Sequence, residues 1–215
     1  MKITLLCSDK QHPIYAYLLR WVESQNSTHQ IDLITKVKEL EQPGDLLFLI
    51  SCSEIVRKTT RDLFRYTLVL HASDLPEGRG WSPHIWDVVN GKDRLTLSLL
   101  DAEDSVDTGN IWQKRNIELD GTELYDEINH KLFEVELELL DWAVNHIDSS
   151  QSVPQENNDQ TTYHRKRTPE DSELDAKASI AEQFNLLRVC DPNRFPAYVV
   201  INNQRYNIRL EKEND

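Results

Sequence analysis

The sequence is poor in cysteine, and the few cysteines it has are scattered. Only Cys7, Cys52 and Cys190 occur in 215 residues, and the seven histidines form no cluster with the spacing of metal ligands. A disulfide framework or a zinc site needs such residues in closely spaced sets. We therefore expect no disulfide scaffold and no bound metal, and the composition fits a reducing, cytoplasmic location.

Basic residues are also scarce. The 24 Lys and Arg residues face 37 Asp and Glu residues, which gives a net charge of −13. Because phosphate backbones bind positive surfaces, we expect no general nucleic-acid partner. No apolar run reaches the roughly 20 residues of a membrane helix. The opening MKITLLCSD has too short an apolar part for a secretion signal and predicts a first strand, so we expect no membrane partner.

Several nucleotide-binding and nucleophile motifs are missing as well. No GxGxxG follows the first apolar run, and neither GxxxxGK[ST] nor GxSxG occurs anywhere. Dinucleotide binding, ATP binding and a serine-hydrolase mechanism therefore have no positive support.

Strand-like apolar runs alternate with helical patterns in the first half of the chain. The pattern predicts strands at 2–7, 29–35, 46–51 and 67–71, and helices at 13–25, 54–64 and 83–91. Further strands are expected at 95–101 and 110–119, followed by a long helix from about Thr122 to Ile147. Such alternation is typical of a Rossmann-like α/β fold, with a mostly parallel sheet flanked by helices.

The remaining sequence predicts a small appended unit. Residues 149–162 are polar and without period, which predicts a linker between an α/β domain at 1–148 and a C-terminal α+β subdomain at 163–215. In that subdomain we expect a helix at 175–188 and a hairpin that turns at Asn202 and Asn203. The hairpin could pair across a homodimer or simply cover the helix, and both alternatives stay open.

His71 stands where chemistry is expected. It ends an apolar strand, and open α/β sheets bind their ligands at the carboxyl ends of strands. Three acids, Asp101, Asp104 and Asp107, lie in or beside the loop after a later strand. If both loops leave the same edge of the sheet, one of these carboxylates can orient the imidazole for proton transfer. A packed core histidine and a solvated acidic turn are the alternatives.

The residues around these positions resemble the catalytic core of the formyltransferases that use N10-formyltetrahydrofolate. The matching residues occur in three blocks: His71, Ser73, Leu75 and Pro76; Arg79, Gly80 and Pro83; and Asp107, Gly109 and Ile111. The family pattern has an Asn two residues before the His, where this chain has Val69.

The resemblance implies acyl transfer without a covalent enzyme intermediate. His71 would hold the developing oxyanion, and Asp107 would orient His71 and help to take the proton from the attacking amine. In place of the family Asn, a hydroxyl such as Ser51 or Ser73, or a backbone N–H, would assist. The implied folate pocket consists of Leu75, Arg79, Gly80, Trp86, Leu100, Asp101 and Asp104. Trp86 fits a core position equally well.

The C-terminal run Arg167, Pro169 and Asp171 resembles that of sugar N-formyltransferases, and the sequence around His71 resembles those of the pseudaminic acid type. With Arg165, this basic cluster suits the phosphates of a nucleotide-linked amino sugar. A basic turn balanced by Glu170 and Asp171 is the alternative. An aminoacyl group or glycinamide ribonucleotide as acceptor, or a binding module without catalysis, also stays open.

Overall fold

The computed structural model describes residues 1–156 and 161–213, and it places a six-stranded sheet at the centre of the fold. The sheet order is β2-β1-β3-β4-β6-β7. These strands span Gln30–Ile34, Lys2–Leu6, Gly44–Leu49, Phe64–His71, Arg94–Asp101 and Ile111–Glu118, respectively. The first four are parallel, whereas β6 is antiparallel to both β4 and β7. The predicted mostly parallel α/β sheet is confirmed.

The direction of β6 corrects one expectation about the site. Asp101 at the end of β6 pairs with Leu68 inside β4, and His71 pairs with Ser98. The loops after β4 and β6 therefore leave the sheet in opposite directions, and not at one shared edge. An apolar run carries no sign of its direction, so the sequence alone could not distinguish the two arrangements.

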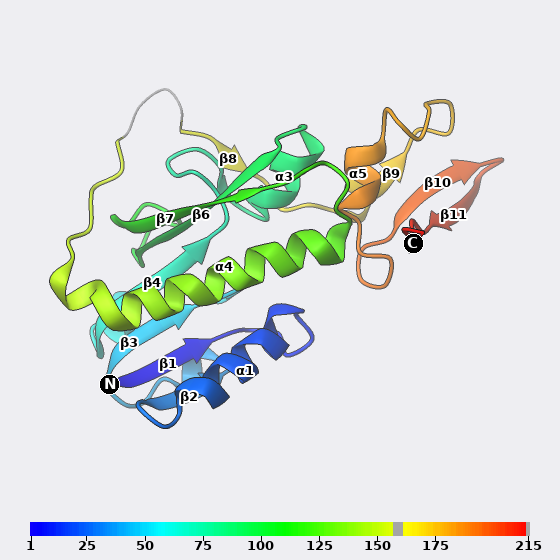
Figure 1. Cartoon of the computed structure of the whole chain (residues 1–215). Helices are drawn as coiled ribbons and strands as arrows, with labels where there is room; N and C mark the ends of the chain where they lie inside the picture. Colours follow the sequence, from blue (N-terminus) through cyan, green and yellow to red (C-terminus); the bar gives the residue numbers. More distant parts are fainter. Residues whose placement is uncertain (157–160, 214–215) are drawn as a thin grey trace.

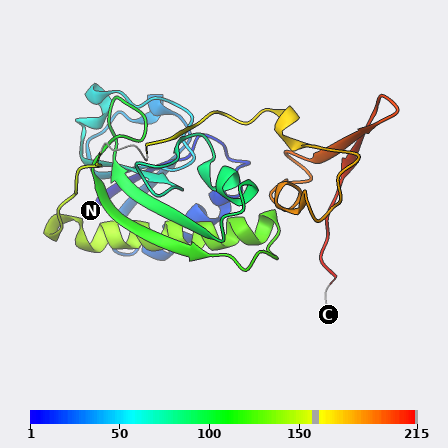
Figure 2. The same cartoon turned by 90° about the horizontal axis from the view of Figure 1, so that it is seen from above.

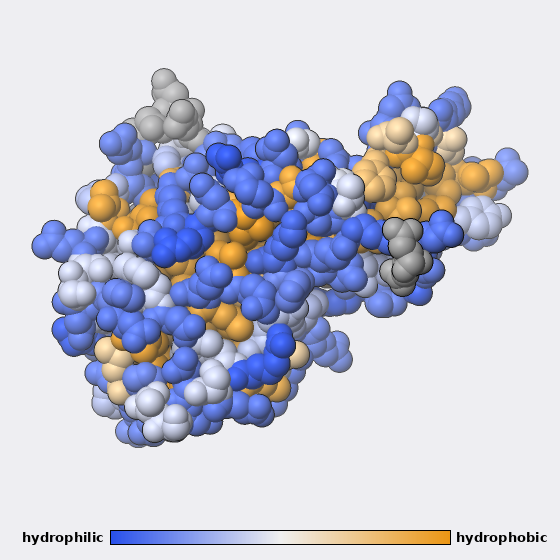
Figure 3. Space-filling view, viewed as in Figure 1, coloured by the Kyte–Doolittle hydropathy of each residue, from blue (hydrophilic) through white to orange (hydrophobic). Residues whose placement is uncertain are grey.

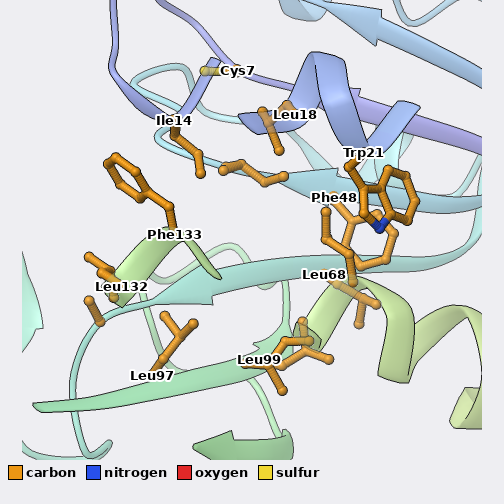
Figure 4. Close-up of a cluster of buried hydrophobic side chains, with 14 of the residues drawn as sticks. Cys7, Ile14, Leu18, Trp21, Phe48, Leu68, Leu97, Leu99, Leu132 and Phe133 are labelled. Carbon is orange, nitrogen blue, oxygen red and sulfur yellow. The ribbon is translucent and has the colours of Figure 1, made fainter. Parts of the chain in front are cut away.

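Two helices cover one face of the sheet. They are α1 (Ile14–Gln25) and α4 (Tyr125–His146), and α4 lies across the strands in both cartoon views (Figures 1 and 2). Their apolar stripes meet the strands in one buried cluster, where Leu18 of α1 and Phe133 of α4 pack with Phe48 and Leu68 (Figure 4). Trp21 adds a 2.7 Å hydrogen bond from its ring nitrogen to Asp141. Apolar residues that recur with the helical period of 3.6 residues thus form the faces of α1 and α4 that pack against the sheet.

The other elements are short. The remaining helices are α2 (Lys58–Arg61), α3 (Pro83–Val89) and α5 (Phe184–Arg188), with 3-10 turns at Val37–Glu39, Ile147–Ser149 and Pro169–Ser172. The strands outside the main sheet are β5 (Arg79–Gly80), β8 (Tyr163–His164), β9 (Glu173–Leu174), β10 (Ala197–Ile201) and β11 (Gln204–Ile208). No helix among the described residues has the length and apolar character that crossing a bilayer requires.

Two predicted helices are longer than those observed. The helix expected at 54–64 is only α2, and the helix expected at 175–188 is only α5. Before α5, side chains bond the backbone: Asp175 accepts from the Lys177 N–H, and Gln183 accepts from the Asp175 N–H. Such local bonds compete with helical ones, which is why the helix begins late.

The C-terminal elements form a separate small layer at the end of the molecule away from the N-terminus (Figures 1 and 2). The sheet β11-β10-β9 packs with α5 around Leu174, Leu187, Cys190 and Ala197. The hairpin turns at Asn202 and Asn203, both with positive φ, as the sequence predicts. Apolar surface gathers on this subdomain in Figure 3.

Candidate active site

His71 is held at both ring nitrogens. It is 7 % exposed at the end of β4, and its Nε2 lies 2.9 Å from the carbonyl oxygen of Gly78. Because a carbonyl only accepts, Nε2 carries a hydrogen and donates it. Nδ1 lies 3.4 Å from Oδ1 of Asp107. Both ring nitrogens of His71 therefore face an oxygen atom, and the buried Asp107 carboxylate lies within ion-pair distance of the ring.

Asp107 contacts His71 although β6, the strand that precedes Asp107, runs antiparallel to β4. The loop 102–110 runs back from β6, and Asp107 adopts a φ of 57° that directs its buried carboxylate to the ring. Its Oδ2 accepts a 2.9 Å hydrogen bond from the Gly80 N–H. Gly109 makes the turn possible, because a Cβ there would lie 1.9 Å from the Asp101 carbonyl oxygen. The geometry of Asp107 therefore depends on main-chain packing within the loop.

Residues 151–156 and 161–164, which we call the strap, run beside this pair. Val153 forms a β-bridge with Ile111, and β8 pairs with β5. The Gln155 amide nitrogen donates to the carbonyl oxygens of Asp107 and Gly109, each at 2.8 Å. Most of the strap belongs to the predicted linker 149–162, of which residues 157–160 lie outside the described residues. Its polar, aperiodic sequence carries no local signal of these contacts.

The two serine candidates differ in their surroundings. Ser73 is 1 % exposed, and its Oγ is buried without a hydrogen-bond partner among the described residues. It lies against Gly78, since a Cβ on Gly78 would be 3.4 Å from this Oγ. Ser51 is exposed, and its Oγ lies 3.4 Å from Nε2 of His12. Only Ser73 thus adjoins the residue whose carbonyl contacts His71.

The residues expected to line a folate pocket do not form one open surface. Leu75 and Leu100 are 1 % and 0 % exposed, so their side chains belong to the interior. The Asp101 carboxylate accepts a 2.6 Å bond from the Trp112 ring nitrogen, and burial raises the pKa of Asp101 against this bond. Asp104 forms a 2.8 Å ion pair with Arg61. By contrast, Arg79 and Gly80 lie directly beside Asp107, because Gly80 bonds its carboxylate.

Trp86 lies in the basic cluster of the C-terminal segment. Its ring stacks on His164 at 5.9 Å, and the Arg165 and Arg167 guanidinium groups lie 5.1 and 5.6 Å from its centroid. Arg165 also binds both Asp171 oxygens, at 2.6 and 2.5 Å, and this lowers the pKa of Asp171. The Arg165 side chain is therefore arranged as in the alternative interpretation, a basic turn whose charge is neutralised by a neighbouring carboxylate.

Arg167 is differently placed. It donates at 2.8 Å to the main-chain oxygen of Asp171 and at 3.3 Å to the Ser172 hydroxyl. Within residues 1–156 and 161–213 it has no carboxylate within ion-pair distance. Its positive charge is therefore less neutralised than that of Arg165.

Two further histidines adjoin the site and were missed from the sequence. Burial, with the positive charges of His12, His71 and Arg167, lowers the pKa of His84 to about 4. Its Nδ1 is buried with no partner among the described residues. Burial, with the charge of Arg194, likewise lowers the pKa of His12 to about 4. His84 directly follows Pro83 of the family pattern, which was the available signal.

The chain is similar to known proteins both in sequence and in fold. No family model matches the chain. It is 28 % identical over 179 residues to methionyl-tRNA formyltransferase from Clostridium beijerinckii, covering 82 % of this chain and 57 % of that protein. The enzyme of the same name from Rickettsia felis is 26 % identical over 170 residues, covering 79 % and 52 %. The chain therefore spans about half the length of the curated relatives it matches.

Solved structures of formyltransferases share the fold of this chain. Methionyl-tRNA formyltransferase from Clostridium thermocellum superimposes with a TM-score of 0.81 at 20 % identity, covering 95 % of this chain and 90 % of that one. The chain is therefore similar to formyltransferases in sequence and shares their fold. A 4-N formyltransferase from Francisella tularensis superimposes on this chain with a TM-score of 0.74 at 15 % identity, covering 100 % of this chain and 98 % of that one. WlaRD, a sugar 3N-formyltransferase solved with dTDP and 5-N-formyl-THF, does so at 0.72 with 15 % identity, covering 94 % and 83 %.

Within the formyltransferase-family pattern, the position of Val69 is the departure. Val69 lies two residues before His71 on β4, hence on the same face of the sheet. It is partly buried against the apolar cluster formed by Leu6, Leu40, Leu47, Leu49, Val56 and Phe64. Val69 therefore packs against apolar side chains, and its own side chain offers no amide donor.

Proposed function

We propose that this chain transfers the formyl group of N10-formyltetrahydrofolate to a primary amine. The observation that carries the proposal is the buried His71–Asp107 pair in a chain that is similar to formyltransferases in sequence and fold. In the reaction, the amine nitrogen forms a bond to the formyl carbon, and the bond from that carbon to N10 of the folate breaks. The amine loses one proton and N10 gains one. The products are the N-formyl amine and tetrahydrofolate.

The proposed role of His71 is to stabilise negative charge on the formyl oxygen. Its Nε2–H already donates to the Gly78 carbonyl, so in the proposed reaction the formyl oxygen shares this N–H with Gly78 in a three-centre hydrogen bond. Donation from an imidazolium is stronger than donation from a neutral group, which compensates for the amide lost at Val69. The unpartnered hydroxyl of Ser73 is the second proposed donor, and its position beside Gly78 favours it over Ser51.

The proposed role of Asp107 is to orient the ring and to accept the proton of the attacking nitrogen. One carboxylate oxygen faces Nδ1 of His71, and the other accepts from the Gly80 N–H. A carboxylate has about four acceptor positions, so these contacts leave capacity for a substrate proton. Burial of the carboxylate strengthens each of these interactions relative to water.

As acceptor we propose a nucleotide-linked amino sugar of the pseudaminic acid precursor type. The net charge of −13 disfavours a tRNA backbone, and Arg167 beside the Trp86 ring offers a cation for a sugar-linked phosphate. The printed names of the curated relatives support a second candidate, an aminoacyl group on tRNA.

An acceptor screen distinguishes these candidates. Purified chain is incubated with N10-formyltetrahydrofolate and, in turn, UDP- or dTDP-linked amino sugars, glycinamide ribonucleotide or methionyl-tRNA, and tetrahydrofolate release is followed. Transfer to a nucleotide sugar alone supports the first proposal, and transfer to methionyl-tRNA replaces it with the second. If calorimetry detects 5-formyltetrahydrofolate binding but no acceptor is formylated, the chain is a binding module and the proposed reaction is wrong.

The acceptor proposal also makes a prediction for the basic cluster. Arg167→Met should raise the KM for the nucleotide sugar about 10-fold or more, because a charge-assisted bond to phosphate is lost. Lys166→Met is the matched control, since Lys166 lies over the Trp81 ring, 4.8 Å from its centroid, and not over Trp86. A KM that is equal in both variants would argue against a phosphate at Arg167.

A further inference from the structure

The two acceptors that contact the His71 ring are each fastened to the strap. The Gly78 carbonyl belongs to the loop after β4, and the Asp107 carboxylate belongs to the loop after β6. No hydrogen bond among the described residues joins these loops near the ring except the one from the Gly80 N–H to Asp107. The strap contacts both, through Gln155 on one side and Thr162 on the other.

Gln155 fixes the turn that carries Asp107. Both hydrogens of its amide nitrogen are used, on the carbonyl oxygens that flank Thr108 at Asp107 and Gly109. Its amide oxygen accepts a 2.7 Å bond from Arg79. The side chain is therefore engaged at both ends, and it spans from the Asp107 turn to the neighbouring Gly78–Gly80 segment.

Thr162 fixes the peptide that faces the other ring nitrogen. The C=O of Gly78 and the N–H of Arg79 belong to one peptide unit, and that N–H donates at 3.0 Å to the Thr162 carbonyl oxygen. The Thr162 hydroxyl also accepts a 2.8 Å bond from the Gly78 N–H. A peptide unit that donates at one end accepts more strongly at the other, so this arrangement strengthens its bond to His71.

The packing around Gly80 leaves the Gly78–Gly80 segment little room to move. A Cβ on Gly80 would lie 2.3 Å from the His164 carbonyl oxygen and 2.9 Å from the Tyr163 ring. The Trp81 N–H continues the pairing by donating to His164 at 3.0 Å. A displacement of the strap would therefore be transmitted to both partners of the imidazole.

We propose that Gln155 and Thr162 are positioning residues, which set the orientation of the His71–Asp107 pair from the strap without contacting substrate. The proposal rests on the proposed formyl transfer for its kinetic consequence, whereas the orientation of the ring can be measured without any reaction. Gln155 has the larger role, because it is partly buried and makes three bonds, whereas Thr162 is exposed to competing water.

The test uses substitutions that keep the approximate shape of the side chain and remove one, two or three of its hydrogen bonds. Gln155→Glu keeps the acceptor for Arg79 but replaces the donating amide with a carboxylate that faces two carbonyl oxygens. Gln155→Met removes all three bonds. Thr162→Val removes only the hydroxyl, whereas Thr162→Ser keeps it. Gln151→Glu and Thr161→Val are matched controls, because they make the same chemical changes at exposed strap positions with no side-chain hydrogen bond to a described residue.

Two readouts are compared. Both Gln155 variants should lower kcat about 10- to 100-fold, the usual consequence of a misplaced catalytic group, with KM values for donor and acceptor within threefold. Thr162→Val should lower kcat about 3- to 10-fold, as expected for one hydrogen bond, and Thr162→Ser should recover most of it. In long-range ¹H–¹⁵N spectra, Gln155→Glu and Thr162→Val should shift the ring nitrogens of His71, while both controls leave them unchanged.

The outcomes separate this inference from the proposed function. If the wild-type chain transfers no formyl group but the His71 nitrogens shift as described, the proposed function fails and the positioning role stands. If the spectra of all strap variants match the wild-type spectrum, the positioning role is overturned. It is also overturned if only Gln155→Met loses activity, since the contact with Arg79 would then explain the effect.

Discussion

Oδ1 of Asp107 lies 3.4 Å from Nδ1 of His71, although the strands that precede the two residues run in opposite directions. The contact exists because the loop 102–110 reverses and passes back along β4, with Gly109 pressed against the Asp101 carbonyl. The relationship between the two residues is therefore a property of the loop, which makes it sensitive to changes outside the pair. Four predictions test this site and the fold that supports it.

The first prediction concerns the pair itself. His71→Ala and Asp107→Asn should each lower kcat for formyl transfer by about 10²- to 10⁴-fold, because proton transfer and oxyanion stabilisation are both lost. The Kd for 5-formyltetrahydrofolate, measured by calorimetry, should stay within threefold of the wild-type value. A variant that binds the folate much more weakly would indicate a binding role for the pair.

The second prediction concerns Gly109. Gly109→Ala requires the backbone to move, since the added Cβ would lie 1.9 Å from the Asp101 oxygen. We expect a loss of about 2 kcal/mol or more in the free energy of unfolding, together with a lower kcat as the Asp107 turn shifts. Urea unfolding and tetrahydrofolate release measure the two effects. Asn110→Ala is the control, because Asn110 is exposed and its main-chain bond to Asp101 survives.

The third prediction is a pH dependence that originates in α4. Burial raises the pKa of Glu136 from 4.5 to about 8, and its Oε2 has no hydrogen-bond partner among the described residues. Between these two values the folded state binds more protons than the unfolded state, so stability falls as pH rises from about 4.5 to 8. Ionisation of Glu136 should lower the free energy of unfolding of the wild type by up to about 1.4 kcal/mol per pH unit within that window.

Glu136→Gln removes this titration, so its Tm relative to wild type should increase between pH 5 and pH 8. Thermal unfolding of both proteins at the two pH values measures the difference. Glu134→Gln is a suitable control, because Glu134 is about half exposed on the same helix. Parallel pH profiles for Glu136→Gln and wild type would show that Glu136 titrates normally.

The fourth prediction concerns the attachment of the C-terminal subdomain. Arg188 of α5 is 3 % exposed, donates to the Glu123 carbonyl at 3.2 Å and lies 3.6 Å from the Glu123 carboxylate. Arg188→Met should destabilise the protein by about 3 kcal/mol, because a buried carboxylate loses one of its partners. Arg94→Met breaks an exposed pair with Glu118 and should cost less than about 1 kcal/mol. Equal losses in chemical denaturation would contradict a buried role for Arg188.

Much of the fold could be read from local patterns. Leu18 and Trp21 recur at the helical spacing that buries α1, and the apolar run before His71 forms β4. Asn202 and Asn203 tolerate the positive φ that a two-residue hairpin turn requires. These features depend on residues close together in the chain, so the sequence displays them directly. His71 and Asp107 could be identified as candidates for a related reason, because each lies in a short sequence motif.

Local patterns are therefore sufficient to predict the helices and strands, their apolar faces and the residue types at the site. The three-dimensional structure was needed to show that β6 runs antiparallel to β4, that Asp107 nevertheless contacts His71, and that Gln155 and Thr162 bind the loops around them. The physical reason is distance along the chain: Gln155 bonds a carbonyl 48 residues away, and Thr162 bonds an N–H 84 residues away. Such hydrogen bonds form between polar groups that suit any exposed loop, and their partners are fixed only when the sheet brings the segments together.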